Sequence, residues 1–161
     1  MSHVEEQIKE TSELLQLVSF TIGSEEFGIN ILFVQEIIRM LQISKVPNSP
    51  SFVNGVINLR GRVIPVIDLR AKLRLERKKH DKNTRIIVVE VASKIVGFIE
   101  DAVREVLRIP KDITEAPPEL VSGVNSEFIM AVAKLEDRLI TLIDLEKISS
   151  SNGKQILSNA A

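Results

Sequence analysis

Side chains that could do covalent or acid–base chemistry are scarce in this chain and badly placed for it. The two histidines are His3, in a polar N-terminal stretch, and His80, inside a basic segment. Neither has a neighbour in the sequence that would make it a general acid, a general base or part of a nucleophilic triad. The sequence contains no cysteine, which excludes a thiolate nucleophile, a thiolate metal site and a disulfide framework.

Carboxylates and glycines make no stronger case for chemistry. The acidic residues are spread along the chain, and the pairs Glu25–Glu26 and Glu100–Asp101 are typical of turns and strand edges rather than of a metal site. The seven glycines are single and far apart, so no glycine-rich loop is present to cradle phosphate. We therefore predict a protein that is not an enzyme and that uses no cofactor or metal.

A fixed positive charge at Arg60 is the feature that most favours a binding function. It lies in the tetrapeptide Asn58–Gly61, where alternation gives the strand one apolar face and one polar face. Directly after this tetrapeptide, the residues from Val63 to Ile67 make both faces apolar. An arginine at the boundary between a polar and an apolar surface suits the docking of a partner better than it suits catalysis.

The elements that must position this segment are predicted to be mostly short β-strands. Alternating apolar residues predict a hairpin over residues 18–31, with its turn at Gly23–Glu26. Further strands are predicted at 35–41, 86–91, 95–99 and as a pair within 128–143, with single helical turns after Asn30 and Asp68 and a short helix over 51–56. Short strands with loops at regular spacing are typical of small barrels or of a sandwich.

The two halves of the chain also match each other in order. Identical or similar residues of the two halves are separated by a constant number of positions at first, and by a slightly larger constant number further on. The matching pairs are Gly28/Gly97, Val34/Val103, Glu36/Glu105, Ile37/Val106 and Arg39/Arg108, followed by Val56/Val132, Arg62/Arg138, Ile67/Ile143, Asp68/Asp144 and Leu69/Leu145. We interpret this as an internal duplication of one β unit. When the two halves are aligned, Asn58–Gly61 corresponds to an unrelated sequence, Lys134–Asp137. Because a feature that the fold requires would be expected in both copies, we interpret Arg60 as functional rather than architectural.

Four segments are predicted along the chain: a flexible N-terminal segment over 1–13, a first β half over 14–79, a second over 80–148 and a flexible tail over 149–161. The N-terminus carries Glu5, Glu6 and Glu10 instead of the basic and apolar regions of a signal peptide. No apolar run approaches the roughly 18 residues needed to span a bilayer. We therefore expect a cytoplasmic protein without direct membrane insertion.

Charge and aromatic content argue against nucleic acid as a partner. The formal net charge is −1, so no global field attracts a polyanion, and the aromatic residues are six Phe with no Trp or Tyr. Most of the clustered basic charge lies between Arg70 and Arg85, a pattern typical of a solvated connector. A small nucleic-acid-binding β-barrel protein that uses this connector as a basic patch is the alternative of another class.

With these segments in view, the chain resembles the CheW family of bacterial chemotaxis coupling proteins over nearly all of residues 15–148. The resemblance is carried by four segments, Val18–Ile22, Glu26–Ile37, Val46–Leu69 and Val96–Val106, in that order and at that spacing. The third includes Gly55-Val-Ile-Asn-Leu-Arg-Gly-Arg-Val-Ile-Pro-Val-Ile-Asp-Leu69. The two tails and the connector are the parts that the resemblance does not cover.

The resemblance implies a mainly β fold of two tandem SH3-like, five-stranded β-barrels with a few short helices, and strands exchanged between the barrels are possible. It also implies a non-enzymatic adaptor that couples the cytoplasmic tips of chemoreceptors to the regulatory domain of the histidine kinase CheA, at membrane-associated receptor arrays. The receptor's helical hairpin would lie in a groove between the barrels. The groove positions that carry over are Ile31, Val34, Glu36, Asn58, Arg60, Val103 and Val106, whereas no kinase-contact residue is identified. A CheW-like scaffold of a different motility or sensory pathway is the nearer alternative.

Overall fold

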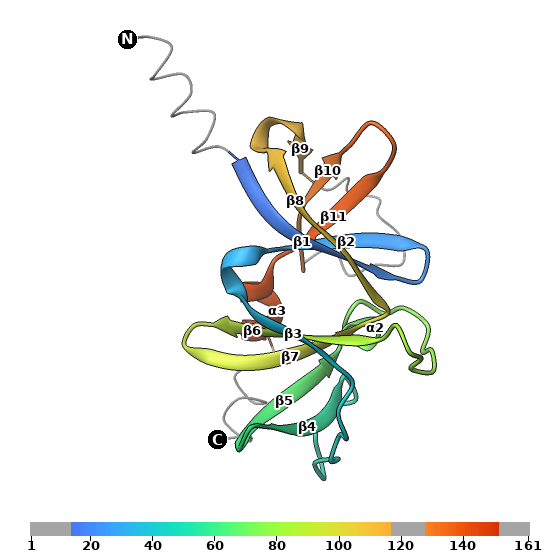
Figure 1. Ribbon diagram of the computed structural model, residues 1–161, viewed down its shortest axis with the longest axis vertical. Coiled ribbons are helices and arrows are strands. Elements are labelled where there is room, and N and C mark those ends of the chain that lie inside the picture. Colours follow the sequence, from blue (N-terminus) through green and yellow to red (C-terminus); the bar gives the residue numbers. More distant parts are fainter. Residues whose placement is uncertain (1–13, 117–127, 152–161) are drawn as a thin grey trace.

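Eleven β-strands in two sheets dominate the part of the chain that the computed structural model describes, residues 14–116 and 128–151. One sheet, called here the upper sheet after its place in Figure 1, has the order β8 (Ala102–Pro110), β1 (Leu14–Ile22), β2 (Glu25–Asn30), β11 (Leu139–Ile143), β10 (Ile129–Lys134), β9 (Thr114–Glu115). The lower sheet has the order β3 (Val34–Arg39), β6 (Arg85–Val91), β7 (Lys94–Glu100), β5 (Arg62–Asp68), β4 (Val53–Leu59). The mainly β fold with few short helices is confirmed.

The strand order makes the duplication visible in three dimensions. Each unit of the duplication supplies five strands, and equivalent strands occupy equivalent places in the two sheets, with the two-residue β9 as a sixth strand in the upper sheet. The units exchange strands, because β1 and β2 lie in the upper sheet with β8 to β11, whereas β6 and β7 lie in the lower sheet with β3 to β5. Each sheet therefore contains strands from both sides of residue 80.

Both faces of the central strands are buried, which explains their unbroken apolar runs. In β6, Ile86 and Val88 belong to a cluster inside the lower barrel, together with Ile57, Ile64, Val66 and Ile99. Ile87 and Val89 point the other way, into a large cluster that we call the shared core because it takes residues from both sheets, among them Phe20, Phe27 and Phe98, together with Ile148 of the C-terminal helix. The upper barrel has its own interior cluster of Leu17, Ile109, Ala133, Ile140 and Leu142. The two barrels thus pack on each other through the shared core.

Local signals place the short helices as predicted, with one exception. The Asn30 side chain accepts a hydrogen bond from Leu32 N at 2.9 Å and starts the 3-10 turn η1 (Ile31–Phe33). Asp68 accepts one from Arg70 N at 2.9 Å and starts α2 (Leu69–Lys72). The helix predicted over 51–56 is wrong, because pairing with β5 outweighs the local proline and glycine signals and draws the chain into β4 from Val53.

The C-terminal end of the described residues and the connector differ in part from the sequence prediction. The predicted flexible segment 1–13 and the predicted tail beyond residue 151 lie outside the described residues, whereas α3 (Leu145–Ser151) includes the first three tail residues. Within the connector, Arg77, Lys79 and His80 are exposed as predicted, but Arg70 is not, since its side chain is only 13% exposed. No helix among the described residues is long and apolar enough to cross a membrane.

Candidate partner-binding site

An exposed ion pair joins two of the predicted site residues. Arg60, in the turn between β4 and β5, donates from one Nη to both carboxylate oxygens of Glu36 on β3, at 2.7 and 2.6 Å. The side chains are 70% and 32% exposed, so the pair adds only about 0–1 kcal/mol to stability. Its charged groups remain open to a partner.

The backbone at Arg60 is held against its intrinsic preference. Leu59 pairs with Arg62 across the hairpin, so the loop contains only Arg60 and Gly61, whose φ angles are 52° and 86°. Positive φ at both central residues defines a type I′ turn, for which Asn-Gly is the favoured sequence. A left-handed conformation costs a residue such as arginine about 1–2 kcal/mol. The turn geometry itself therefore does not explain why this position is an arginine.

Asn58 has a structural explanation. Its side-chain oxygen accepts a hydrogen bond from Gly61 N at 2.8 Å, which closes the same hairpin turn. The residue is exposed at the end of β4, on the hairpin that carries Arg60. Asn58 therefore shapes the turn that presents the guanidinium group.

The predicted apolar site residues come from both sheets. They lie on η1 and β3, on the side of the lower sheet, and on β8 of the upper sheet. Ile31 of η1, Val34 of β3 and Val103 of β8 are partly buried and pack against the shared core. Val106, further along β8, is 62% exposed. Both β3 and β8 are edge strands of their sheets. The structure thus gathers Ile31, Val34 and Val103 on one core and Glu36 with Arg60 in one pair, while a groove that unites all seven residues stays a prediction.

Both edge strands contain a β-bulge at the equivalent position of the duplication, which the sequence analysis missed. In β3 the register with β6 shifts between Val34 and Glu36, and in β8 the register with β1 shifts between Val103 and Glu105. Bulges bend a strand and redirect its side chains, and they are enriched next to functional sites. Each bulge here sits between the valine and the glutamate of its unit.

A second glutamate–arginine pair corrects the argument that Arg60 has no counterpart. Arg138, in the turn between β10 and β11, forms an ion pair with Glu105 of β8 and another, at 2.8 Å, with Glu26 of β2. The interaction is therefore repeated in the second unit, although its arginine lies at a shifted position of the turn. The matches Glu36/Glu105 and Arg62/Arg138 were the signal in the sequence that could have revealed it. What distinguishes Arg60 is its exposure and its left-handed backbone.

Pockets lie beside the ion pair and elsewhere. A pocket of about 120 Å³ is lined by Glu36 and Arg60 together with Gln35, Arg62 and the apolar Leu59, Ile64, Val88 and Ile95. This mixed lining of charged and apolar side chains matches the boundary predicted from the sequence. A larger pocket of about 520 Å³ is formed by the loop between β3 and β4 with Arg77 and His80, and none of the predicted site residues lines it.

Fold and site together define a class of protein: two small barrels on a common core, with charged and apolar side chains exposed along edge strands. The family model described as CheW-like domain matches residues 16–152. The chain therefore belongs to the CheW-like family.

Known proteins of similar sequence carry the same family name. Chemotaxis protein CheW of Klebsiella aerogenes is 36% identical over 146 residues, which cover 91% of this chain and 88% of the relative. Chemotaxis protein CheW of Helicobacter pylori is 39% identical over 140 residues, covering 87% and 84%. The crystal structure of the scaffolding protein TtCheW from Thermoanaerobacter tengcongensis superimposes with a TM-score of 0.79 at 37% identity, covering 86% of this chain and 90% of that one.

Proposed function

We propose that this protein is a chemotaxis adaptor that couples the cytoplasmic tips of chemoreceptors to the regulatory domain of the histidine kinase CheA, and that it has no catalytic activity of its own. Family membership and the names of the relatives support the chemotaxis role. By this proposal the protein works in the cytoplasm and is recruited to membrane-associated receptor arrays. The observation that carries the binding role is the exposed Arg60–Glu36 pair on a strained turn.

The proposed receptor contact is an amphipathic helix lying against the seven predicted residues. Burying some 400–600 Å² of apolar surface gives a gross gain of about 10–15 kcal/mol at about 25 cal/mol per Å². Loss of rigid-body freedom and ordering of side chains cost about 4–15 kcal/mol of it. Binding of a single receptor is therefore expected to be weak and reversible, with Arg60 and Glu36 fixing the orientation of the helix through charge complementarity.

Reconstitution from purified parts tests the proposal directly. A receptor cytoplasmic fragment, the kinase and this protein are mixed, and kinase autophosphorylation is measured with and without the protein. Receptor control of the kinase is expected only in the complete mixture. Kinase output that ignores the receptor fragment, with no binding of this protein to either partner, would reject the proposed function.

The connector provides a prediction of small effect. Neutralising Lys78 and Lys79 together is expected to leave receptor and kinase affinity nearly unchanged, because Lys78 is half exposed and its ion pairs with Asp81 and Asp101 are long, at 3.6 and 3.9 Å. Titration calorimetry or surface plasmon resonance on both partners measures it. A large loss, or polynucleotide binding by the unmodified protein that weakens steeply with salt, would favour the nucleic-acid alternative.

A further inference from the structure

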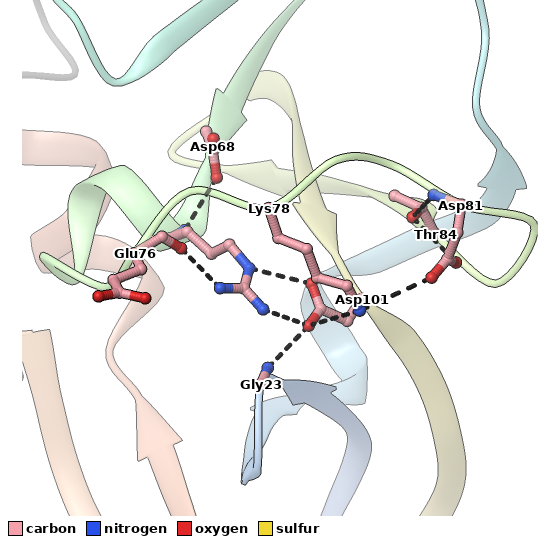
Figure 2. Close-up of polar contacts among 8 residues, drawn as sticks. Gly23, Asp68, Glu76, Lys78, Asp81, Thr84 and Asp101 are labelled. Carbon is pink, nitrogen blue, oxygen red and sulfur yellow. Dashed lines mark hydrogen bonds and ion pairs between the residues drawn. The ribbon is translucent and has the colours of Figure 1, made fainter.

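A single carboxylate lies where the chain crosses from one sheet to the other. Asp101 is the one residue between β7 of the lower sheet and β8 of the upper sheet. Its backbone N donates to Thr21 O of β1 at 3.0 Å, and its Oδ2 accepts from Gly23 N, in the turn between β1 and β2, at 2.7 Å. Figure 2 shows the carboxylate of Asp101 between two donors, the backbone of Gly23 on one side and a guanidinium group on the other.

That guanidinium group belongs to Arg70, on the lower-sheet side. Arg70 lies in α2, directly after β5, and donates from Nε and one Nη to the two oxygens of Asp101, at 3.1 and 2.5 Å. Its other Nη donates to Glu76 O at 2.6 Å, which also anchors the connector. The two parallel bonds form the bidentate geometry that fixes both distance and orientation. We call the Arg70–Asp101 pair the clasp.

The clasp is shielded from solvent, unlike the pair at Arg60. The Arg70 and Asp101 side chains are 13% and 18% exposed. Partial burial acts to raise the pKa of Asp101, but the hydrogen bonds from Arg70 and Gly23 and the charges of Arg70 and Lys78 outweigh it and lower this pKa. The sequence predicts ordinary turn or strand-edge charges at Glu100–Asp101, and Asp101 does lie in the bend between two strands, but its carboxylate also links the two sheets.

Directional bonds at this position matter because the remaining contact between the barrels is largely apolar. The shared core stabilises the barrels against each other, but the apolar contribution is non-directional and does not by itself fix the angle between the sheets. β8 begins immediately after Asp101 and carries Val103 and Val106, whereas Glu36 lies on β3 of the other sheet. A rotation between the sheets would change the spacing of these site residues.

We propose that Arg70 and Asp101 are positioning residues for partner binding: the clasp sets the angle between the upper and lower sheets, and so the spacing of the β8 and β3 residues of the candidate site. This inference rests on the proposed function, since it takes the site to span both sheets. The clasp residues themselves do not touch the partner. Their substitution would act through geometry.

Two conservative variants test the clasp in the full chain. Arg70→Lys keeps the charge but removes the bidentate geometry, and Asp101→Asn keeps an acceptor for Gly23 but removes the charge. Ile57→Val and Ile140→Val, each inside one barrel, are controls that lower stability without touching the clasp. Three quantities are measured: the melting temperature, the angle between the sheets from residual dipolar couplings of amides in β6 and β10, and the Kd for the receptor cytoplasmic fragment.

The clasp variants are expected to change the angle or broaden its distribution and to weaken receptor binding by about fivefold, whereas controls of equal melting temperature keep both. An unchanged angle and Kd in a folded Arg70→Lys protein would overturn the proposal, whatever the fall in melting temperature. If Asp101→Asn does not fold, Arg70→Lys decides alone. If the unmodified protein fails to bind the receptor fragment, the proposed function fails, and the dipolar couplings still decide whether the clasp sets the angle.

Discussion

Replacing Arg60 by asparagine is expected to weaken binding of the receptor fragment by about tenfold or more while leaving the melting temperature unchanged or raised. Arginine is enriched among the interface residues whose truncation costs this much binding free energy. The substitution loses an exposed ion pair with Glu36, worth about 0–1 kcal/mol. It also relieves the left-handed strain at φ 52°, because asparagine is favoured at this place of a type I′ turn. Titration calorimetry and thermal unfolding measure the two effects.

Arg74→Asn is a closely matched control for this experiment. Arg74 is also exposed, also has a positive φ, of 61°, and lies just after the C-cap of α2, outside the candidate site. It should show a similar change in melting temperature with unchanged receptor affinity. Glu36→Lys, which places like charge beside Arg60, should weaken binding as Arg60→Asn does. A several-degree fall in melting temperature with intact binding would assign Arg60 and Glu36 to the fold instead.

Replacing Glu100 by glutamine is expected to raise the melting temperature, by an amount that grows with pH. Glu100 ends β7 opposite Arg85 of β6, is 1% exposed, and neither of its carboxylate oxygens has a hydrogen-bond partner among the described residues. Burial raises the pKa of this carboxyl well above its ordinary value, with Arg85 acting to lower it and Asp101 to raise it further. The folded protein therefore favours the neutral form.

The direction of the pH effect follows from this raised pKa. Stability from the buried neutral carboxyl is fully present below the unfolded pKa and is lost as the pH rises through the higher pKa of the folded protein. Glutamine stays neutral throughout, so the variant should match the original protein near pH 4 and exceed it at pH 8. At about 2–4 °C for each kcal/mol, a gain of about 3 °C or more is expected at pH 8.

Thermal unfolding followed by circular dichroism between pH 4 and pH 8 checks this prediction. Glu25→Gln removes an exposed carboxylate at the start of β2 and serves as the control, with no growing difference expected. A Glu100→Gln protein that melts lower than the original at pH 8 would mean that the carboxylate is charged and stabilised where it lies. A higher melting temperature of the variant, as expected, would show that the Glu100 carboxyl lowers the stability of the fold at neutral pH.

Most local structure could be predicted because it depends on neighbouring residues. The hairpin over 18–31, the strands near 86–91 and 95–99, and the helical turns after Asn30 and Asp68 all follow from alternation, turn residues and caps. The prediction failed over 51–56, where β4 forms because its partner β5 lies further along the chain. A local signal is outweighed wherever pairing with a distant strand stabilises another conformation.

The candidate site shows the same division. Glu36 and Arg60 could both be selected from the sequence, but their contact across 24 residues could not, nor could the left-handed turn that exposes Arg60. The sequence predicts that Arg70 lies in a solvated connector, and its bidentate contact with Asp101, 31 residues away, appears only in the folded chain. Glu105 and Arg138 were present in the duplication but were not recognised as a pair.

The sequence by itself determined the β character of this protein, its duplicated plan and the residue types available for binding. These properties depend on composition and on short-range order, which the chain carries before it folds. Only the tertiary structure decided which strands are exchanged between the barrels, which charges meet and which are buried. The physical reason is that such contacts arise from the closure of long segments around common cores, where packing and desolvation, rather than neighbours in the sequence, select each partner.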